Sequence, residues 1–396
     1  MLFFAVVYVV EGIGQARVGI IYQPLTYYLK VTGWTPVQVT AYLAILNFPW
    51  IIKPLLGLVS DFVPLLGYRR KSYLILSSLC AVGAYAGIAR LSEPSEFALL
   101  LLLTSYAMAT ASTLCGALLA EYGRSFRVSG AFVSQQWLWF YIAIMASSFV
   151  GGALVERVSP LAALHAAAAI AAVAPVAIIL AALFLLDERK VALSRLEMRR
   201  TFQSIVSAAR SARLYVVALF LFLYAFAPGF GTPLYYFMTD ELKFSQAYIG
   251  ILGSIASAGW IAGALLHRWF LARMSPKALL YLSIVLGTLS AASFLLLADE
   301  VTAAIVNFAN GAAMMIATIA TLTLAADYCP RRSEGFAFAG LMSIMNLAEL
   351  CSNTVGAYLY EHLFDNRLGP LIVVSAASTA LAAVLVPWLR LEGKVR

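Results

Sequence analysis

Charged residues are scarce in this chain. Asp, Glu, Lys and Arg together make up 12% of its 396 residues, whereas hydrophobic residues make up 62%. Soluble globular domains are about 25% charged and about 45–50% apolar. The deficit of charge excludes an ordinary soluble enzyme, and the length therefore does not indicate two or three soluble domains.

Cysteine and histidine are also rare, with four and three copies. The cysteines lie in or at the ends of apolar runs and show neither metal-ligand spacing nor a disulfide framework. The sequence contains no phosphate-binding loop of the P-loop type and no Ser/His/Asp constellation. It opens in an apolar run that Glu11 interrupts, without the basic region and cleavage site of a secretory signal. We expect no metal, no cofactor, no ATP hydrolysis and no enzymatic activity.

What the chain does contain is a series of long apolar runs. A helix needs about 20 mainly apolar residues to cross a bilayer. Lipid offers the backbone no hydrogen-bond partner, and the runs lack the alternation of a β-barrel, so every run is predicted to be a helix. The fold class is an all-α membrane protein, and the twelve predicted spans are residues 3–28, 36–58, 72–90, 97–119, 131–155, 160–186, 214–238, 246–270, 277–297, 301–326, 335–359 and 368–389.

The basic residues predict the orientation of these spans. Of the 27 Lys and Arg residues, 20 lie after even-numbered spans, five lie in the other gaps, and Arg17 and Lys53 lie inside spans. The positive-inside rule places both termini in the cytoplasm and the protein in the cytoplasmic (inner) membrane. The formal net charge of +8 thus comes from basic residues between spans of a protein in the lipid bilayer, and it does not indicate binding of nucleic acid.

The chain also repeats itself weakly at a spacing of 205–206 residues. Gly57-x3-Asp61 aligns with Gly263-x3-His267, and Gly151 aligns with Gly356. Two related sets of six helices joined by a basic cytoplasmic segment are typical of the major facilitator fold. We therefore predict a six-helix half in residues 1–186, a linker in 187–213 and a second six-helix half in 214–396.

The most specific motif follows the second span. Gly57 precedes Asp61 by four residues, and Arg70 and Lys71 follow within a basic turn. A glycine allows another helix to approach closely, and Asp61 can pair with a nearby arginine. Such a contact would act as a latch that stabilises one of two access states, although a turn with positive-inside residues would look similar.

Four ionisable residues lie inside spans, where they are costly and mark functional sites by default. They are Glu11, Arg17, Lys53 and Glu349. The rise of a helix places Arg17 and Glu349 at a common depth, about 21 Å from the cytoplasmic start of their spans. Glu349 and Glu11 are the candidates for protonatable carboxylates. A permanent ion pair of Glu349 with Arg17 is the alternative, and pairing of Glu11 with Lys53 is also possible.

Polar residues three and four positions apart share one face of a helix. Two such stripes point to cavity-lining or helix-packing faces in the spans. The first comprises Tyr8, Glu11 and Gln15, and the second comprises Asn346, Glu349 and Asn353. Gln15, Asn346 and Asn353 are therefore candidate substrate-binding residues, together with Arg17.

One span contains the helix-breaking sequence from Pro228 to Pro233, with two prolines and two glycines. Such breaks are tolerated where the backbone lines a cavity or moves as a gate, so Pro228 and Pro233 are candidate gating residues. Trp137 is a candidate for stacking on a flat aromatic substrate, with helix packing as the alternative.

The stretch from Ile52 to Leu74, Ile-Lys-Pro-Leu-Leu-Gly-Leu-Val-Ser-Asp-x2-Pro-x2-Gly-Tyr-Arg-Arg-Lys-x-Tyr-Leu, resembles the folate–biopterin transporter family of the major facilitator superfamily. The segments around Tyr236–Ser245 and Leu341–Leu347 are similar to the same family. The chain departs from it where the family carries acidic residues in its fourth helix and an arginine in its fifth. Those positions hold Ser112, Gly116 and Phe140, whereas Glu121 is kept.

The resemblance implies proton-coupled transport of a small organic solute, anionic and pteridine- or folate-like. Because the departures affect charged positions, a muropeptide or siderophore permease of the same fold is an alternative. A non-transporting assembly factor for pigment–protein complexes is another, although the charges inside the spans argue against a pure scaffold.

Overall fold

Helices make up most of the described chain. The computed structural model describes residues 1–126, 129–190, 210–329 and 334–389, and isolated positions between 199 and 206. Within these ranges, the one β-type contact is an isolated bridge between Leu65 and Tyr68. The prediction of an all-α fold is confirmed. Most of the predicted linker, residues 187–213, lies outside the described residues.

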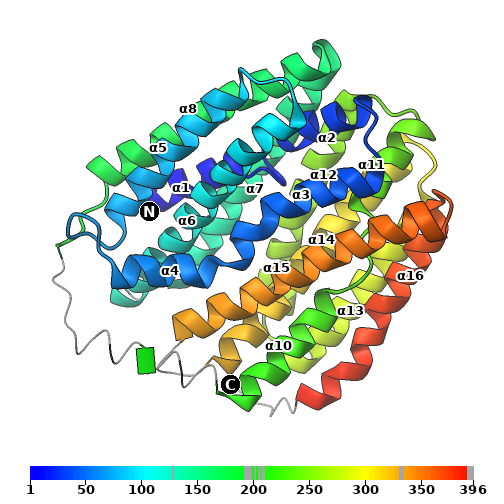
Figure 1. Cartoon of the computed structure of the whole chain (residues 1–396). Helices are drawn as coiled ribbons and strands as arrows, with labels where there is room; N and C mark the ends of the chain where they lie inside the picture. The colour runs from blue at the N-terminus through cyan, green and yellow to red at the C-terminus, as the bar shows by residue number, and fades with distance from the viewer. Residues whose placement is uncertain are drawn as a thin grey trace. The chain divides into compact units, whose positions relative to one another are not determined.

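The chain divides into two compact units, whose helices are labelled in Figure 1. Unit 1 comprises Met1–Trp34, Tyr42–Thr201 and Gln246–Ser254, and unit 2 comprises Thr35–Ala41, Phe202–Ser245 and Ile255–Arg396. The helices are α1 (Leu2–Gly14), α2 (Tyr22–Val31), α3 (Pro36–Ile51), α4 (Lys53–Phe62), α5 (Lys71–Ile88), α6 (Pro94–Phe126), α7 (Ser129–Arg157), α8 (Pro160–Phe184), α10 (Ala212–Ala225), α11 (Gly231–Asp240), α12 (Gln246–Leu266), α13 (Pro276–Ser293), α14 (Glu300–Tyr328), α15 (Glu334–Tyr358) and α16 (Leu368–Leu381).

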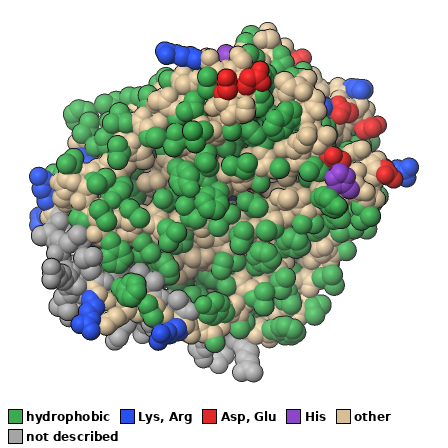
Figure 2. Space-filling view, viewed as in Figure 1, with side chains coloured by type: hydrophobic (Ala, Val, Ile, Leu, Met, Phe, Trp, Pro, Cys, Tyr) green, Lys and Arg blue, Asp and Glu red, His purple; other side chains and the backbone are tan. Residues whose placement is uncertain are grey.

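Most predicted spans coincide with helices of membrane-crossing length. In the described part of the chain, nine helical segments are long and apolar enough to cross a membrane. The three other predicted spans fall on the pair α1 and α2, on the pair α10 and α11, and on α15. Apolar side chains dominate the drawn surface, and the coloured charged residues gather near its edges (Figure 2). These features are those of a multi-pass membrane protein.

The span predicted as one helix over residues 3–28 is broken. Gln15 follows α1 with an extended backbone, and Ile20 N–H donates back to Ile13 C=O at 3.0 Å. At Gly19 an added Cβ would collide with the backbone of Ile13 and Gln15, so this return of the chain requires glycine. Arg17 therefore lies in a non-helical segment between α1 and α2 and not on a helix face.

The break in residues 226–230 agrees with the sequence prediction. Pro228 has no N–H to donate, and α10 ends at Ala225 before α11 begins at Gly231. Pro233 is the third residue of α11, and Pro24 is the third residue of α2. Proline is tolerated there because N–H groups in the first turn have no intrahelical partner. Both units thus contain a helix that stops and restarts ahead of a proline.

Small residues pack the helices within unit 1. α8 buries Ala163, Ala167 and Ala171, and its neighbour α5 buries Ala81 and Ala84. Without large side chains between them the two backbones approach closely, which is how helices associate where lipid removes the hydrophobic drive. Unit 2 buries a larger-residue core along α10, α13 and α14, which includes Val217, Leu221, Leu280, Ile284, Ile316 and Leu324.

Candidate functional site

Each broken helix is held by a serine and a glycine four residues apart on a neighbouring helix. In unit 1, Ser147 on α7 donates to Gly12 C=O at 3.4 Å, and a Cβ on Gly151 would lie 3.2 Å from the carbonyl oxygen of Ile20. In unit 2, Ser352 and Gly356 on α15 make the corresponding contacts with Ala227 and Gly229. The 205-residue spacing noted in the sequence therefore relates both glycines and both serines.

The unit 2 contacts are tighter. Ser352 Oγ donates to Ala227 C=O, and Gly229 N–H donates to Ser352 C=O at 2.9 Å. A Cβ on Gly356 would collide with the carbonyl oxygen of Gly229. The backbone groups that the break removes from the helix ladder are thus partly satisfied by α15, which is required inside a membrane.

A cluster of charged and polar groups lies beside the break in unit 1. Lys53 Nζ donates to Ser112 Oγ on α6 at 3.0 Å and lies 4.2 Å from the ring centroid of Trp50. The guanidinium carbon of Arg17 lies 5.7 Å from the same ring. Glu11 is 7% exposed and interacts electrostatically with both Lys53 and Arg17. Direct pairing of Glu11 with Lys53 stays a prediction.

Three buried polar atoms follow the predicted stripe on the first span. All three atoms are buried; within the described residues Glu11 Oε2 and Gln15 Oε1 have no hydrogen-bond partner in the protein, whereas Tyr8 Oη lies beside the thiol of Cys115. Each such atom is costly unless a ligand or water satisfies it. A row of them beside two cations therefore indicates a polar site suited to a hydrogen-bonding solute.

The break between α3 and α4 places two of these residues. Pro54 cannot donate a backbone N–H, so the helix ladder is interrupted and Lys53 becomes the first residue of α4. Trp50 lies near the end of α3 and Lys53 at the start of α4, so the break sets how the ammonium meets the indole ring. Pro54 was the sequence signal for this break, whereas the contacts of Lys53 with Trp50 and Ser112 were not predicted.

The second predicted stripe lies on one continuous helix, α15. Glu349 is exposed, and Asn346 and Asn353 are partly buried. Asn353 also packs against the break in unit 2, because a Cβ on Gly229 would lie 3.2 Å from its Cα. Trp137 on α7 is partly buried and stacks on Tyr141 with ring centroids 5.9 Å apart, which leaves its substrate-stacking role a prediction.

The predicted Asp61–Arg70 contact is present within unit 1. Arg70 Nη1 lies 2.7 Å from Asp61 Oδ1, and Arg70 Nη2 lies 3.2 Å from Glu121 Oε1 on α6. The Arg70 side chain is 7% exposed, and Ser60 Oγ accepts a further bond from Nη1 at 2.7 Å. A Cβ on Gly57 would meet Thr113 at an ordinary 3.4 Å, so packing does not require glycine there.

Glu188 completes this end of unit 1. Its carboxylate accepts the backbone N–H groups of Arg69, Arg70 and Lys71, the last at 2.7 Å, and so caps the start of α5. Lys71 Nζ donates to the carbonyl of Leu183 in the last turn of α8 and to that of Leu186 just past its end. No local sequence pattern announced Glu188, because its partners are more than 100 residues away.

Replacing Arg70 by methionine is expected to destabilise unit 1 by about 1.5–3 kcal/mol, because charged hydrogen bonds to Asp61 and Glu121 are lost. Lysine, which keeps the charge but not the forked donor geometry, should recover only part of this. The measurement is the thermal unfolding midpoint in detergent. Met at the exposed Lys277 is the matched control, and an Arg70→Met midpoint equal to the control's would contradict the role assigned to the contact.

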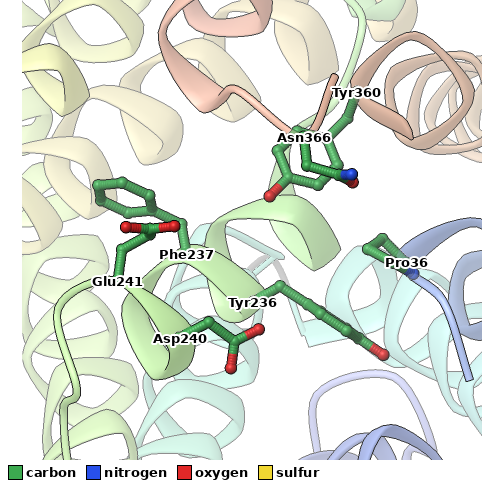
Figure 3. A pocket seen from close by; sticks show the side chains of 7 residues that line it. All are labelled: Pro36, Tyr236, Phe237, Asp240, Glu241, Tyr360 and Asn366. Carbon is green, nitrogen blue, oxygen red and sulfur yellow. The ribbon is translucent and has the colours of Figure 1, made fainter. Parts of the chain in front are cut away.

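Unit 2 has a separate small cavity of about 160 Å³ (Figure 3). It contains two acidic side chains from the end of α11, Asp240 and Glu241, and it includes none of the residues predicted to bind substrate. Its lining residues are Pro36, Tyr236, Phe237, Asp240, Glu241, Tyr360 and Asn366.

Comparison with solved structures identifies the fold. A mutant form of the nucleoside transporter NupG superposes with a TM-score of 0.74 at 16% identity and covers 98% of this chain and 99% of its own. A D-xylose-proton symporter superposes with a TM-score of 0.74 at 13% identity, with coverage of 97% and 96%. The predicted major facilitator fold is confirmed.

Sequence comparison identifies the family. The model of the BT1 family matches residues 14–392. A folate-biopterin transporter from Synechocystis is 30% identical over 95% of this chain and 78% of its own length. Folate transporter 2 from Plasmodium falciparum is 24% identical, with coverage of 90% and 81%. The match extends over all the helices from Gly14 onward, so the chain belongs to the BT1 family of folate-biopterin transporters, as its second-span motif indicated.

Proposed function

We propose that this protein carries a small anionic, pteridine- or folate-like solute across the cytoplasmic membrane by proton-coupled alternating access. The observation that carries the proposal is the charged cluster of Glu11, Arg17 and Lys53 at the break in unit 1. Charges at membrane depth are expensive and are kept where they bind solutes or protons. The names of the relatives supply the solute class.

In the proposed mechanism, Arg17 attracts the anionic group, and the solute also contacts Gln15, Trp137, Asn346 and Asn353. Glu11 or Glu349 takes up the proton. The rest of the mechanism concerns movement. Residues 1–186 and 214–396 act as the two rocking halves, with both termini in the cytoplasm and 187–213 as the linker.

Two groups of residues would govern that movement. Asp61 and Arg70, with Gly57 and Lys71 beside them, form a cytoplasmic latch whose rupture shifts the population between access states. Pro228 and Pro233 bound the break in unit 2, where the missing backbone hydrogen bonds allow α11 to tilt relative to α10. The contacts of Ser352 and Gly356 support such a tilt, because they hold the break against α15 at one point and do not fix the two flanking helices.

Uptake of labelled folate and of labelled biopterin by cells that express the chain tests the proposal. We expect accumulation that a protonophore abolishes, with empty-vector cells as the control. Uptake that survives loss of the proton gradient would contradict the coupling. A protein that reaches the membrane and transports neither solute would contradict the solute class, and a muropeptide and siderophore panel would follow.

A further inference from the structure

Lys53 differs from Glu11 in its accessibility. Glu11 is 7% exposed, whereas Lys53 and Arg17 are partly exposed. As whole residues, the two cations are thus less buried than the carboxylate. Arg17 is already part of the proposed mechanism, and Lys53 is not.

The surroundings of Lys53 hold its ammonium without immobilising it fully. Ser112 Oγ accepts one hydrogen bond, and an ammonium group has three N–H donors. The face of Trp50 attracts the charge, because an aromatic ring carries negative potential on its face. Four methylene groups link the ammonium to the start of α4, so a small rotation can redirect its remaining donors.

We propose that Lys53 binds the anionic group of the solute, that ionised Glu11 and the solute compete for its ammonium, and that Trp50 positions it. This inference rests on the proposed function. While Glu11 is ionised, it attracts Lys53; when Glu11 accepts a proton, Lys53 turns to the solute. Protonation of Glu11 and binding of the anion then favour each other to the same extent, as linkage requires.

The other groups near Glu11 support its assignment as the proton site. From α1 and the break, Tyr8 and Arg17 face it, and from α4 and α6 Lys53 and Cys115 face it. The titratable residues on the neighbouring stretches of α7 and α8 are engaged elsewhere. Tyr141 stacks on Trp137, and His165 bonds to the carbonyl of Leu91 at 2.6 Å. Glu11 is thus the carboxylate of this cluster.

Folate and biopterin are the probes, because folate has carboxylate groups and biopterin shares its ring system without them. Their binding to the purified full-length protein is measured by calorimetry. The Lys53→Met variant is expected to bind folate about ten- to hundredfold more weakly, as loss of a charged hydrogen bond requires, while biopterin affinity changes little. Trp50→Leu should weaken folate binding to a smaller extent, and Trp50→Phe should restore part of it. Lys277→Met, at an exposed position, is the control.

The pH dependence of folate affinity gives a second test. Between about pH 6 and pH 8 the carboxylates of folate stay ionised, so a change in affinity reports the protein. Wild-type affinity for folate should rise as pH falls, and in Glu11→Gln this rise should be smaller, because the competing carboxylate is gone. This variant tests the competition even where Lys53→Met does not fold.

The outcomes separate the two claims. An equal loss of folate and biopterin affinity in Lys53→Met would overturn the inference, because a structural role predicts no preference for the anion. Unchanged pH dependence in Glu11→Gln would also overturn it, with the proposed solute class intact. Binding of neither probe by the wild-type protein would overturn the proposed solute class, and this inference with it.

Discussion

Gly356→Ala is expected to lower the stability of unit 2 by about 1–3 kcal/mol or more, since its methyl group would overlap the backbone of Gly229. The obstacle is main chain, which cannot change rotamer, so α15 or the break in residues 226–230 must move. Transport should also be lost, because residues 226–230 would no longer pack against α15. The thermal unfolding midpoint in detergent and folate uptake measure the two effects.

The chain offers matched controls for this substitution. Gly340 lies on the same helix, and an added Cβ there meets no atom within 4 Å, so Gly340→Ala should be neutral or stabilising by about 0.5–1 kcal/mol. The loss of stability in Gly151→Ala should fall between those of Gly356→Ala and Gly340→Ala, because its Cβ would lie 3.2 Å from the carbonyl oxygen of Ile20. Equal midpoints for Gly356→Ala and Gly340→Ala would show that the contact does not hold the break.

Glu11→Gln is expected to abolish accumulation of folate driven by the proton gradient. In proteoliposomes, each coupled proton allows about tenfold accumulation per pH unit, because tenfold corresponds to about 1.4 kcal/mol. Glu11→Gln cannot exchange that proton, and folate should therefore only equilibrate across the membrane while exchange of internal for external folate continues. Glu349→Gln alone shows whether the carboxylate on α15 contributes a second coupled proton.

Exchange activity is the control here, because it demonstrates a folded protein that still binds solute and moves. Normal accumulation by the double variant Glu11→Gln/Glu349→Gln would contradict the assignment of both carboxylates. Loss of accumulation together with loss of exchange would place the defect in solute binding, and the affinity measurements would then locate it.

Much of the fold could be predicted from the sequence because the bilayer imposes simple rules. Span length, the bias of basic residues and the 205–206-residue repeat together indicated a major facilitator protein. The break in residues 226–230 was also predictable, because Pro228 and Pro233 remove backbone donors. The break after α1 was not, since Gly19 looks like any other membrane glycine until the chain is seen to fold back onto Ile13 and Gln15.

The residues of the site could be predicted from the sequence, but not which of them contact one another. Charges inside spans identified Glu11, Arg17 and Lys53 as candidates, and helical spacing made a pairing of Glu11 with Lys53 possible in depth. Helical geometry could not reveal that Trp50 contacts two cations or that Ser112 accepts from Lys53, because both contacts depend on chain breaks and on a helix remote in sequence. The capping by Glu188 is long-range in the same way.

The two broken helices have an electrostatic consequence that no side chain provides. α1 and α10 end, and α2 and α11 begin, within segments predicted to cross the membrane. The helix dipole is equivalent to about half an elementary charge at each terminus, positive at the N-terminus and negative at the C-terminus. These partial charges belong to the backbone, so they neither titrate nor disappear on mutation. The polarity of the interior thus has a fixed component at every pH, to which the proton-dependent charge of Glu11 is added.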